Sequence, residues 1–123
     1  MQAANVTKDD IDLLVTNEAQ ESASLELKET IPCKNGVDPW ITDQSPIGDY
    51  GRNAILSEII GFANAHGGDV VIGIQESNDH PHRAAGITPL PQCTDLANRI
   101  SLQCRDCIDP PIINLQSAGI LCN

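Results

Sequence analysis

Apolar residues recur at helical spacing just before a double glycine, and a second apolar run follows the glycines. Between residues 52 and 65 this spacing predicts a helix with one apolar face, formed by Ile55, Ile59, Ile60 and Ala63. Gly67 and Gly68 supply the positive-φ geometry with which a chain leaves a helix and reverses. Asp69–Gln75 is then largely β-branched and apolar, which predicts a strand covered on both faces. We therefore expect Phe62 and Val71 to be buried and Gly67 or Gly68 to have positive φ.

The same patterns place the remaining helices and strands. Thr7 is typical of a helix N-cap, and the apolar face of the helix after it is formed by Ile11, Leu14 and Val15. Alternation of leucine with charged residues predicts a half-buried strand over Ser24–Thr30. The other expected elements are a short strand over Ala84–Ile87, a helix from Pro91 or Thr94 to about Cys107 with Leu96, Ile100 and Cys104 or Cys107 facing the core, a strand beginning with Ile112, Ile113 and Leu115, and another at Ile120 and Leu121.

A long loop separates the first predicted strand from the glycine-terminated helix. Residues 31–51 are rich in Pro, Gly, Asp and Asn and show no period, and we expect Trp40 to anchor this loop to the body of the protein. The 123 residues suffice for one domain, residues 1–123. The pattern predicts a mixed α/β (α+β) fold, in which three helices pack on a twisted mixed sheet.

Composition limits the kind of partner. The net charge is −10, and the seven basic residues are scattered along the chain, so composition does not predict strong unaided binding to nucleic acid. No apolar run is long enough for a membrane helix, and a secretory signal pattern is absent. Five cysteines without framework-like spacing favour a reduced, cytoplasmic setting over a secreted one.

Several of these segments together resemble the AlbA-like domain of the Schlafen superfamily. The resemblance covers about residues 18–112 and depends on Glu21-x4-Glu26-x-Lys28, the run from Phe62 to Ile74, Ala85-Gly86-Ile87, and Ile108-Asp109-Pro110-Pro111. It implies a nucleic-acid-binding domain, DNA or RNA, with a regulatory role such as transcription regulation. Family members normally continue with another strand pair, so the resemblance implies a domain shortened at its C-terminus, either alone, as a homodimer, or within a larger parent protein.

The resemblance also implies a carboxylate site, because some Schlafen proteins are ribonucleases. Two acids flanking the first strand and one after the Gly-Ile strand end correspond here to Glu21, Glu26 and Glu76, which would be both catalytic residues and ligands of Mg²⁺ or Mn²⁺. Gln75 departs from the family, which often has an acid there, and an amide at this position lowers the negative charge available to a metal ion. The competing interpretation is that these glutamates are solvated surface acids and that no cofactor is bound.

A nucleic-acid contact surface would need cations on one face. We expect Lys28, Arg52 and Arg83 to share that face with Asn64, since Lys28 and Arg52 flank the two family motifs. Asn64 has a second interpretation as a cap at the C-terminus of its helix, and His66 fits a surface turn.

Cysteine spacing offers a different site. Cys104-x-x-Cys107 has the spacing of half a zinc site, for which Cys33, Cys93, Cys122, His80 and His82 are candidate partners. No second paired motif exists, and two cysteines one turn apart also fit a helix face packed in the core, which we favour. Two other functions remain open beside nucleic-acid binding: a metal-dependent endoribonuclease, and a protein-interaction module that has lost nucleic-acid binding.

Overall fold

The computed structural model describes residues 3–43, 45–110, 112 and 114–122. A short 3₁₀ turn, η1 (Ala3–Asn5), precedes α1 (Lys8–Thr16) and β1 (Leu25–Lys28). The order then runs α2 (Pro39–Asp43), α3 (Asp49–Ala63), β2 (Asp69–Ile72), β3 (Ile74–Glu76), β4 (Ala84–Ile87) and α4 (Cys93–Cys107). The mixed α/β class is as predicted. The described residues hold four α-helices, whereas three were predicted, because α2 forms inside the segment predicted to be a loop.

Gly73 divides the predicted long strand into β2 and β3. β2 pairs in parallel with β1, and β3 pairs antiparallel with β4. The Gly73 N–H donates to the Lys28 carbonyl at 2.7 Å, and the Gly73 carbonyl accepts from the Thr88 N–H at 2.7 Å. Its φ of +103° turns the chain from one partner to the other, and a Cβ there would lie 2.9 Å from the Thr88 oxygen. The prediction of one strand over Asp69–Gln75 was therefore wrong. Gly73 bends the chain inside this apolar run and separates two strands that pair with different partners.

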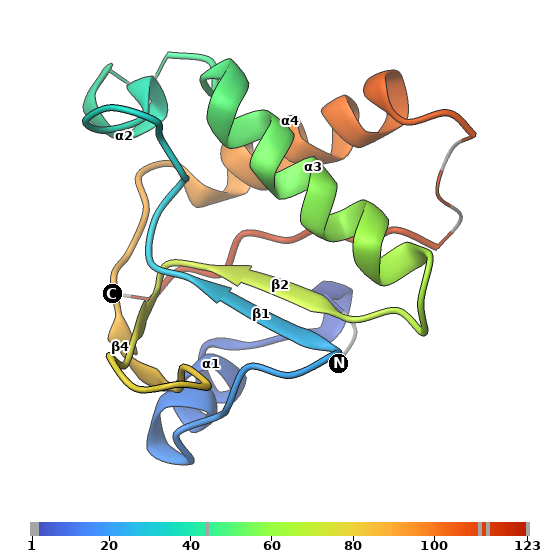
Figure 1. Ribbon diagram of the computed structural model, residues 1–123. Helices are drawn as coiled ribbons and strands as arrows, with labels where there is room; N and C mark the ends of the chain where they lie inside the picture. The colour runs from blue at the N-terminus through green and yellow to red at the C-terminus, as the bar shows by residue number, and fades with distance from the viewer. Residues whose placement is uncertain (1–2, 44, 111, 113, 123) are drawn as a thin grey trace.

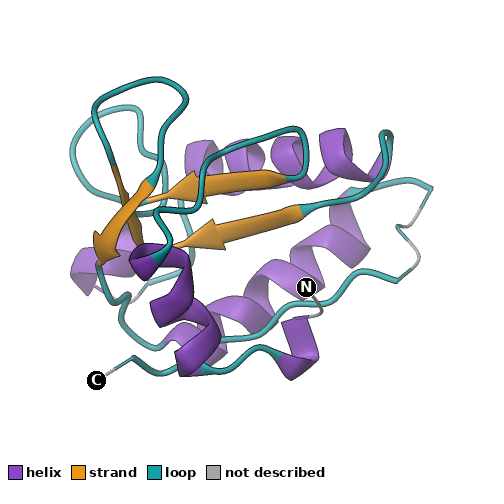
Figure 2. Ribbon diagram, turned by 90° about the horizontal axis from the view of Figure 1, so that it is seen from below, coloured by secondary structure: helices purple, strands orange, loops and turns teal. Residues whose placement is uncertain are grey.

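Helices cover both faces of the β1–β2 pair. In Figure 1, α3 and α4 lie above the pair and α1 lies below it, and Figure 2 shows the same arrangement from below. The upper core contains Ile31, Trp40, Ile47, Ile55 and Leu96, and the lower core contains Ile11, Leu27, Ile74 and Ala84. Strand alternation divides the side chains: Val71 packs into the lower core and Ile72 into the upper one.

The helix-to-strand turn follows the predicted geometry closely. α3 ends at Ala63, Asn64 is its C-cap, and Gly67 has a φ of +84°. Gly68 lies so close to the ring of Phe62 that a Cβ would approach it to 2.9 Å. Phe62 and Val71 are half-buried, whereas we expected both to be buried.

The segment 31–51 is organised by a buried acid. Asp38 is 1% exposed, and its two carboxylate oxygens accept from the Trp40 N–H at 2.9 Å and the Gly48 N–H at 3.0 Å. Gly48 is the N-cap of α3, so one carboxylate holds the first turns of two helices. Trp40 is buried, and its indole N–H donates to the Pro91 carbonyl at 2.9 Å, which ties this segment to the start of α4.

The C-terminal segment forms no strand in its described residues, 112 and 114–122. The strands predicted at Ile112, Leu115 and Ile120 are therefore corrected, and Ile113 lies outside the described residues. The Ser117 hydroxyl donates to the Ala97 carbonyl at 2.8 Å, and Gly119 lies against the backbone of Cys93. Packing against α4 thus replaces strand pairing. Among the described helices, none combines the length and apolar character needed to cross a membrane.

Candidate functional site

Glu21 is positioned by a stretch of extended chain that runs beside β4. The Glu21 N–H donates to the His82 carbonyl at 2.8 Å, and the Ala84 N–H donates to the Ala19 carbonyl at 2.8 Å. These bonds place the segment before β1 against the residues that lead into β4. Glu21 and His82, 61 positions apart in the sequence numbering, become neighbours through this backbone pairing.

The Glu21 side chain turns back toward β1. One carboxylate oxygen accepts a hydrogen bond from the Leu27 N–H at 3.0 Å. Ser24 and Lys28 direct their carbonyls toward β2, so the backbone groups of Leu27 face the other edge of β1. The carboxylate therefore satisfies a donor on an edge strand and is itself held in one orientation, with its second oxygen unused by this bond.

Glu76 reaches the same place from the end of β3. The register of β3 with β4 shifts between Gln75 and Glu76, so that Glu76 pairs with Ala84. Gln75 is exposed and Glu76 is half-buried. The amide that departs from the family pattern thus points to solvent, and the acid after it points toward Glu21 and His82.

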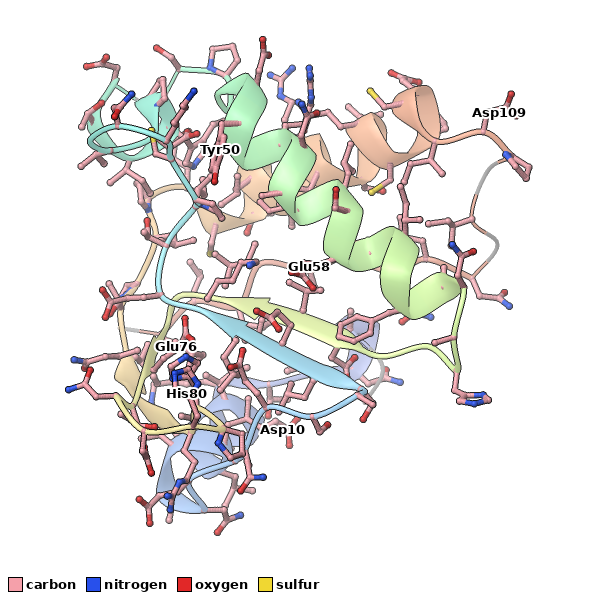
Figure 3. All side chains as sticks on the ribbon, in the orientation of Figure 1. Asp10, Tyr50, Glu58, Glu76, His80 and Asp109 are labelled. Carbon is pink, nitrogen blue, oxygen red and sulfur yellow. The ribbon has the colours of Figure 1, made fainter. Side chains whose placement is uncertain are left out.

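His82 completes a group of three converging side chains. Its Nδ1 lies 2.7 Å from the Ser77 carbonyl oxygen, and its Nε2 lies 3.8 Å from a carboxylate oxygen of Glu76. One potential ligand atom each from Glu21, Glu76 and His82 lies within 4.8 Å of the other two. The hydrogen bond to Ser77, followed by the charges of Glu76 and Glu21, raises the pKa of His82. Figure 3 shows Glu76 and His80 together near the β3–β4 hairpin, and the His80 and His82 ring centroids are 4.3 Å apart.

Glu26 connects this group to α3 through a line of charges. Burial, followed by the neighbouring carboxylates of Glu21 and Glu58, raises the pKa of Glu26, and Lys28 partly opposes the shift. The Lys28 Nζ lies 3.6 Å from Glu26 and 3.8 Å from Glu58. Figure 3 shows Glu58 between α3 and β1. Negative charge therefore exceeds positive charge along this edge of the sheet.

The donor set fits a divalent cation. Two ligand atoms on opposite sides of a metal ion, each about 2.1 Å from it, are about 4.2 Å apart, and the Nε2 of His82 lies 3.8 Å from a carboxylate oxygen of Glu76. A neutral histidine whose Nδ1–H donates to a carbonyl directs its Nε2 lone pair outward, the usual arrangement of a metal-binding imidazole. The structure thus brings Glu21 and Glu76 together as the sequence suggested. It places Glu26 next to Glu21 but outside the group of three.

The three cations predicted to contact nucleic acid, Lys28, Arg52 and Arg83, each have an acidic partner. Arg52 contacts Asp49 at 3.4 Å, and Arg83 forms an ion pair with Asp79. Arg52 lies in the first turns of α3 and Asn64 caps its other end, about 18 Å away at 1.5 Å per residue. Within the described residues, five of the seven basic side chains have an acidic partner: Lys8, Lys28, Arg52, Arg83 and Arg105.

Cysteines and the apolar interior contribute no ligand to this group. Cys104 is buried on α4, where burial raises the pKa of its thiol, whereas Cys107 is exposed. Within the described chain, the group of three is the one set of converging metal-ligand side chains, and it holds no cysteine. A cavity of about 1070 Å³ lies between β2, α3, α4 and the C-terminal segment, and none of the clustered carboxylates lines it.

Sequence reasoning overlooked two organising residues. His82 was considered only as a partner for cysteines, although the pairing of Glu76 with Ala84 brings the residue two before Ala84 close to Glu76. The alternation of histidine and proline at 80–82 before a short strand was the available signal. Asp38 was passed over as one more acid in a polar loop, because nothing local distinguishes a buried helix-capping aspartate from an exposed one.

Comparison with known proteins identifies the family. A family model described as Schlafen, AlbA_2 matches residues 21–121, so this chain belongs to the Schlafen AlbA_2 domain family. The match begins at Glu21 and includes Glu26, Glu76 and His82. Neither the curated proteins nor the solved structures yielded a match.

Proposed function

We propose that this chain is a nucleic-acid-binding domain in which a divalent cation bridges the protein to a phosphate. The convergence of Glu21, Glu76 and His82 within 4.8 Å carries this proposal. The family supplies the association with nucleic acid. This chain holds two of the potential cation ligands in fixed orientations. The hydrogen bond from the Leu27 N–H orients the Glu21 carboxylate, and the Ser77 carbonyl orients the His82 ring.

A bridging cation would offset the electrostatic repulsion between this acidic protein and a phosphate. Phosphate binding through lysine and arginine would have to overcome a net charge of −10 and displace existing acidic partners from Lys28, Arg52 and Arg83. A cation between the carboxylates and a phosphate removes the repulsion at the point of contact. Lys28 keeps its contacts with Glu26 and Glu58 in this arrangement, and Glu26 in turn adjoins Glu21.

Fluorescence anisotropy with labelled single-stranded RNA and DNA oligonucleotides tests the proposal. We expect binding in the presence of Mn²⁺ or Mg²⁺, loss of binding with EDTA, and loss of binding by Glu76→Gln in the presence of the cation. Glu29→Gln is the matched control, because Glu29 is an exposed glutamate just beyond β1. Binding that is indifferent to EDTA would contradict the bridging cation. No binding to either nucleic acid under any condition would favour the protein-interaction module.

Metal-dependent endoribonuclease activity is the second candidate, and the position of Glu26 favours it. A carboxyl group whose pKa is raised, beside the proposed cation ligand Glu21, keeps its proton to higher pH than an exposed glutamate and can exchange it with a neighbouring group. A bound divalent cation would supply a water of lowered pKa and stabilise charge on the phosphate. In this scheme Glu21 and Glu76 hold the cation, Glu26 exchanges a proton, and Lys28 offsets phosphate charge.

Cleavage assays distinguish this candidate from binding alone. With Mn²⁺ and a labelled RNA, we expect Glu26→Gln to abolish cleavage while RNA binding persists, whereas Glu21→Gln and Glu76→Gln remove both. Intact RNA after prolonged incubation with the unaltered chain would exclude the nuclease and leave the binding proposal standing.

We propose a cytoplasmic location for the domain, since its five unpaired cysteines suit a reducing compartment.

A further inference from the structure

His82 changes the chemistry of the cation site, and we infer that it makes the site selective for a divalent transition-metal ion over Mg²⁺. This inference rests on the proposed cation site and concerns which ion that site takes. Magnesium prefers oxygen ligands almost exclusively, whereas Mn²⁺ and the later divalent ions also accept imidazole nitrogen. A site of carboxylates alone would not discriminate in this way.

The geometry commits the imidazole to the site. The Ser77 carbonyl, 2.7 Å from Nδ1, fixes the ring and accepts the proton of that nitrogen, so Nε2, which faces Glu76 at 3.8 Å, is the nitrogen available to a cation. Ser77 is in turn fastened to the hairpin, because its N–H donates to the Arg83 carbonyl and its hydroxyl accepts from the Arg83 N–H, both at 2.9 Å. The nitrogen donor is therefore positioned by backbone bonds within the β3–β4 connection.

His80 provides an internal comparison. Its ring lies 4.3 Å from that of His82, yet it is exposed and does not belong to the group of three converging side chains. The two histidines lie in the same loop, where His80 is exposed and His82 is half-buried. A change at His80 therefore reproduces the loss of an imidazole from this hairpin without removing the proposed ligand.

Calorimetric titration of the full chain with Mn²⁺ and with Mg²⁺, after removal of bound metal, measures the selectivity. We expect one Mn²⁺ bound at least about ten-fold more tightly than Mg²⁺. His82→Gln, which retains an oxygen donor, should lower Mn²⁺ affinity about ten-fold or more and leave Mg²⁺ affinity nearly unchanged, so that the preference disappears. His80→Gln should retain it.

Pulsed electron paramagnetic resonance of bound Mn²⁺ gives a signature that a purely structural histidine would not affect. A directly bound imidazole couples its nitrogen to the manganese, and this coupling should be present in the unaltered chain and in His80→Gln and absent in His82→Gln. Equal affinities for the two ions, bound Mn²⁺ without nitrogen coupling, or no cation binding would each overturn the inference. Equal affinities with cation-dependent nucleic-acid binding would leave the proposed function intact. Nitrogen-coupled Mn²⁺ without nucleic-acid binding would reject the function and keep the inference.

Discussion

The carboxylate of Glu21 accepts a hydrogen bond from the Leu27 N–H at 3.0 Å, so an acid of the candidate site also closes the outer edge of β1. Function and stability are coupled at this residue, and substitutions separate them. Glu21→Gln keeps an oxygen acceptor and should change the free energy of unfolding by less than about 1 kcal/mol. Glu21→Ala leaves the donor of Leu27 unsatisfied and should cost about 1–3 kcal/mol. Urea denaturation compares the two, and equal stability of both variants would show that the bond does not support the strand edge.

Glu26 should make the stability of this protein depend on pH. Burial and the charges of Glu21 and Glu58 raise the pKa of Glu26 in the folded state, so the folded protein binds this proton more tightly than the unfolded chain. Stability therefore falls as pH rises from the unfolded pKa, about 4.3, through the raised folded pKa. Glu26→Gln should melt at a higher temperature than the unaltered chain at pH 7, and the difference should vanish below about pH 4.

The exposed Glu29 provides the control for this pH series. The melting temperature of Glu29→Gln should equal that of the unaltered chain across the pH series, since the Glu29 side chain lies in solvent beyond β1. If Glu26→Gln still melted at a higher temperature than the unaltered chain at pH 3.5, by the same margin as at pH 7, the effect would come from packing and not from ionisation.

Gly73 should be among the least replaceable residues. Alanine at this position combines a φ of +103° with a Cβ only 2.9 Å from the Thr88 carbonyl oxygen. We expect Gly73→Ala to cost about 2 kcal/mol or more in the free energy of unfolding. Gly36→Ala is the matched control, because Gly36 also has positive φ, +79°, but has open space around the added carbon. Similar losses for both variants would mean that the close approach to Thr88 adds nothing to the cost of the backbone conformation.

Asp38 should be essential to the segment between β1 and α3. Asp38→Ala removes the acceptor of two N–H groups, those of Trp40 and Gly48, at the starts of α2 and α3. With about 1–3 kcal/mol for each donor left unsatisfied, we expect a loss of about 2 kcal/mol or more. Thermal unfolding followed by the fluorescence of Trp40 reports both stability and local order, since this chain has one tryptophan. Asp43→Ala, on the exposed last residue of α2, should be nearly neutral, and an equal effect of both changes would contradict the capping role.

The sequence by itself determined the elements whose signals are local. Thr7 caps α1 through a capping box with Asp10, Gly67 ends the turn after α3, and Ala84–Ile87 is the predicted strand. Each depends on backbone preferences or periodicities that a few neighbouring residues encode. The family motifs were equally readable, and the matched region 21–121 includes them.

Only the tertiary structure decided what depends on partners distant in the sequence. The bend at Gly73 exists because Lys28 and Thr88 bond its two sides, and nothing in an apolar run of five residues reveals such a change of partner. The C-terminal segment packs on α4 through Ser117 and Gly119, although its apolar composition fits a strand equally well. His82 joined Glu21 and Glu76 for the same reason: backbone pairing across a hairpin sets which side chains meet, and the sequence records the side chains without recording the register.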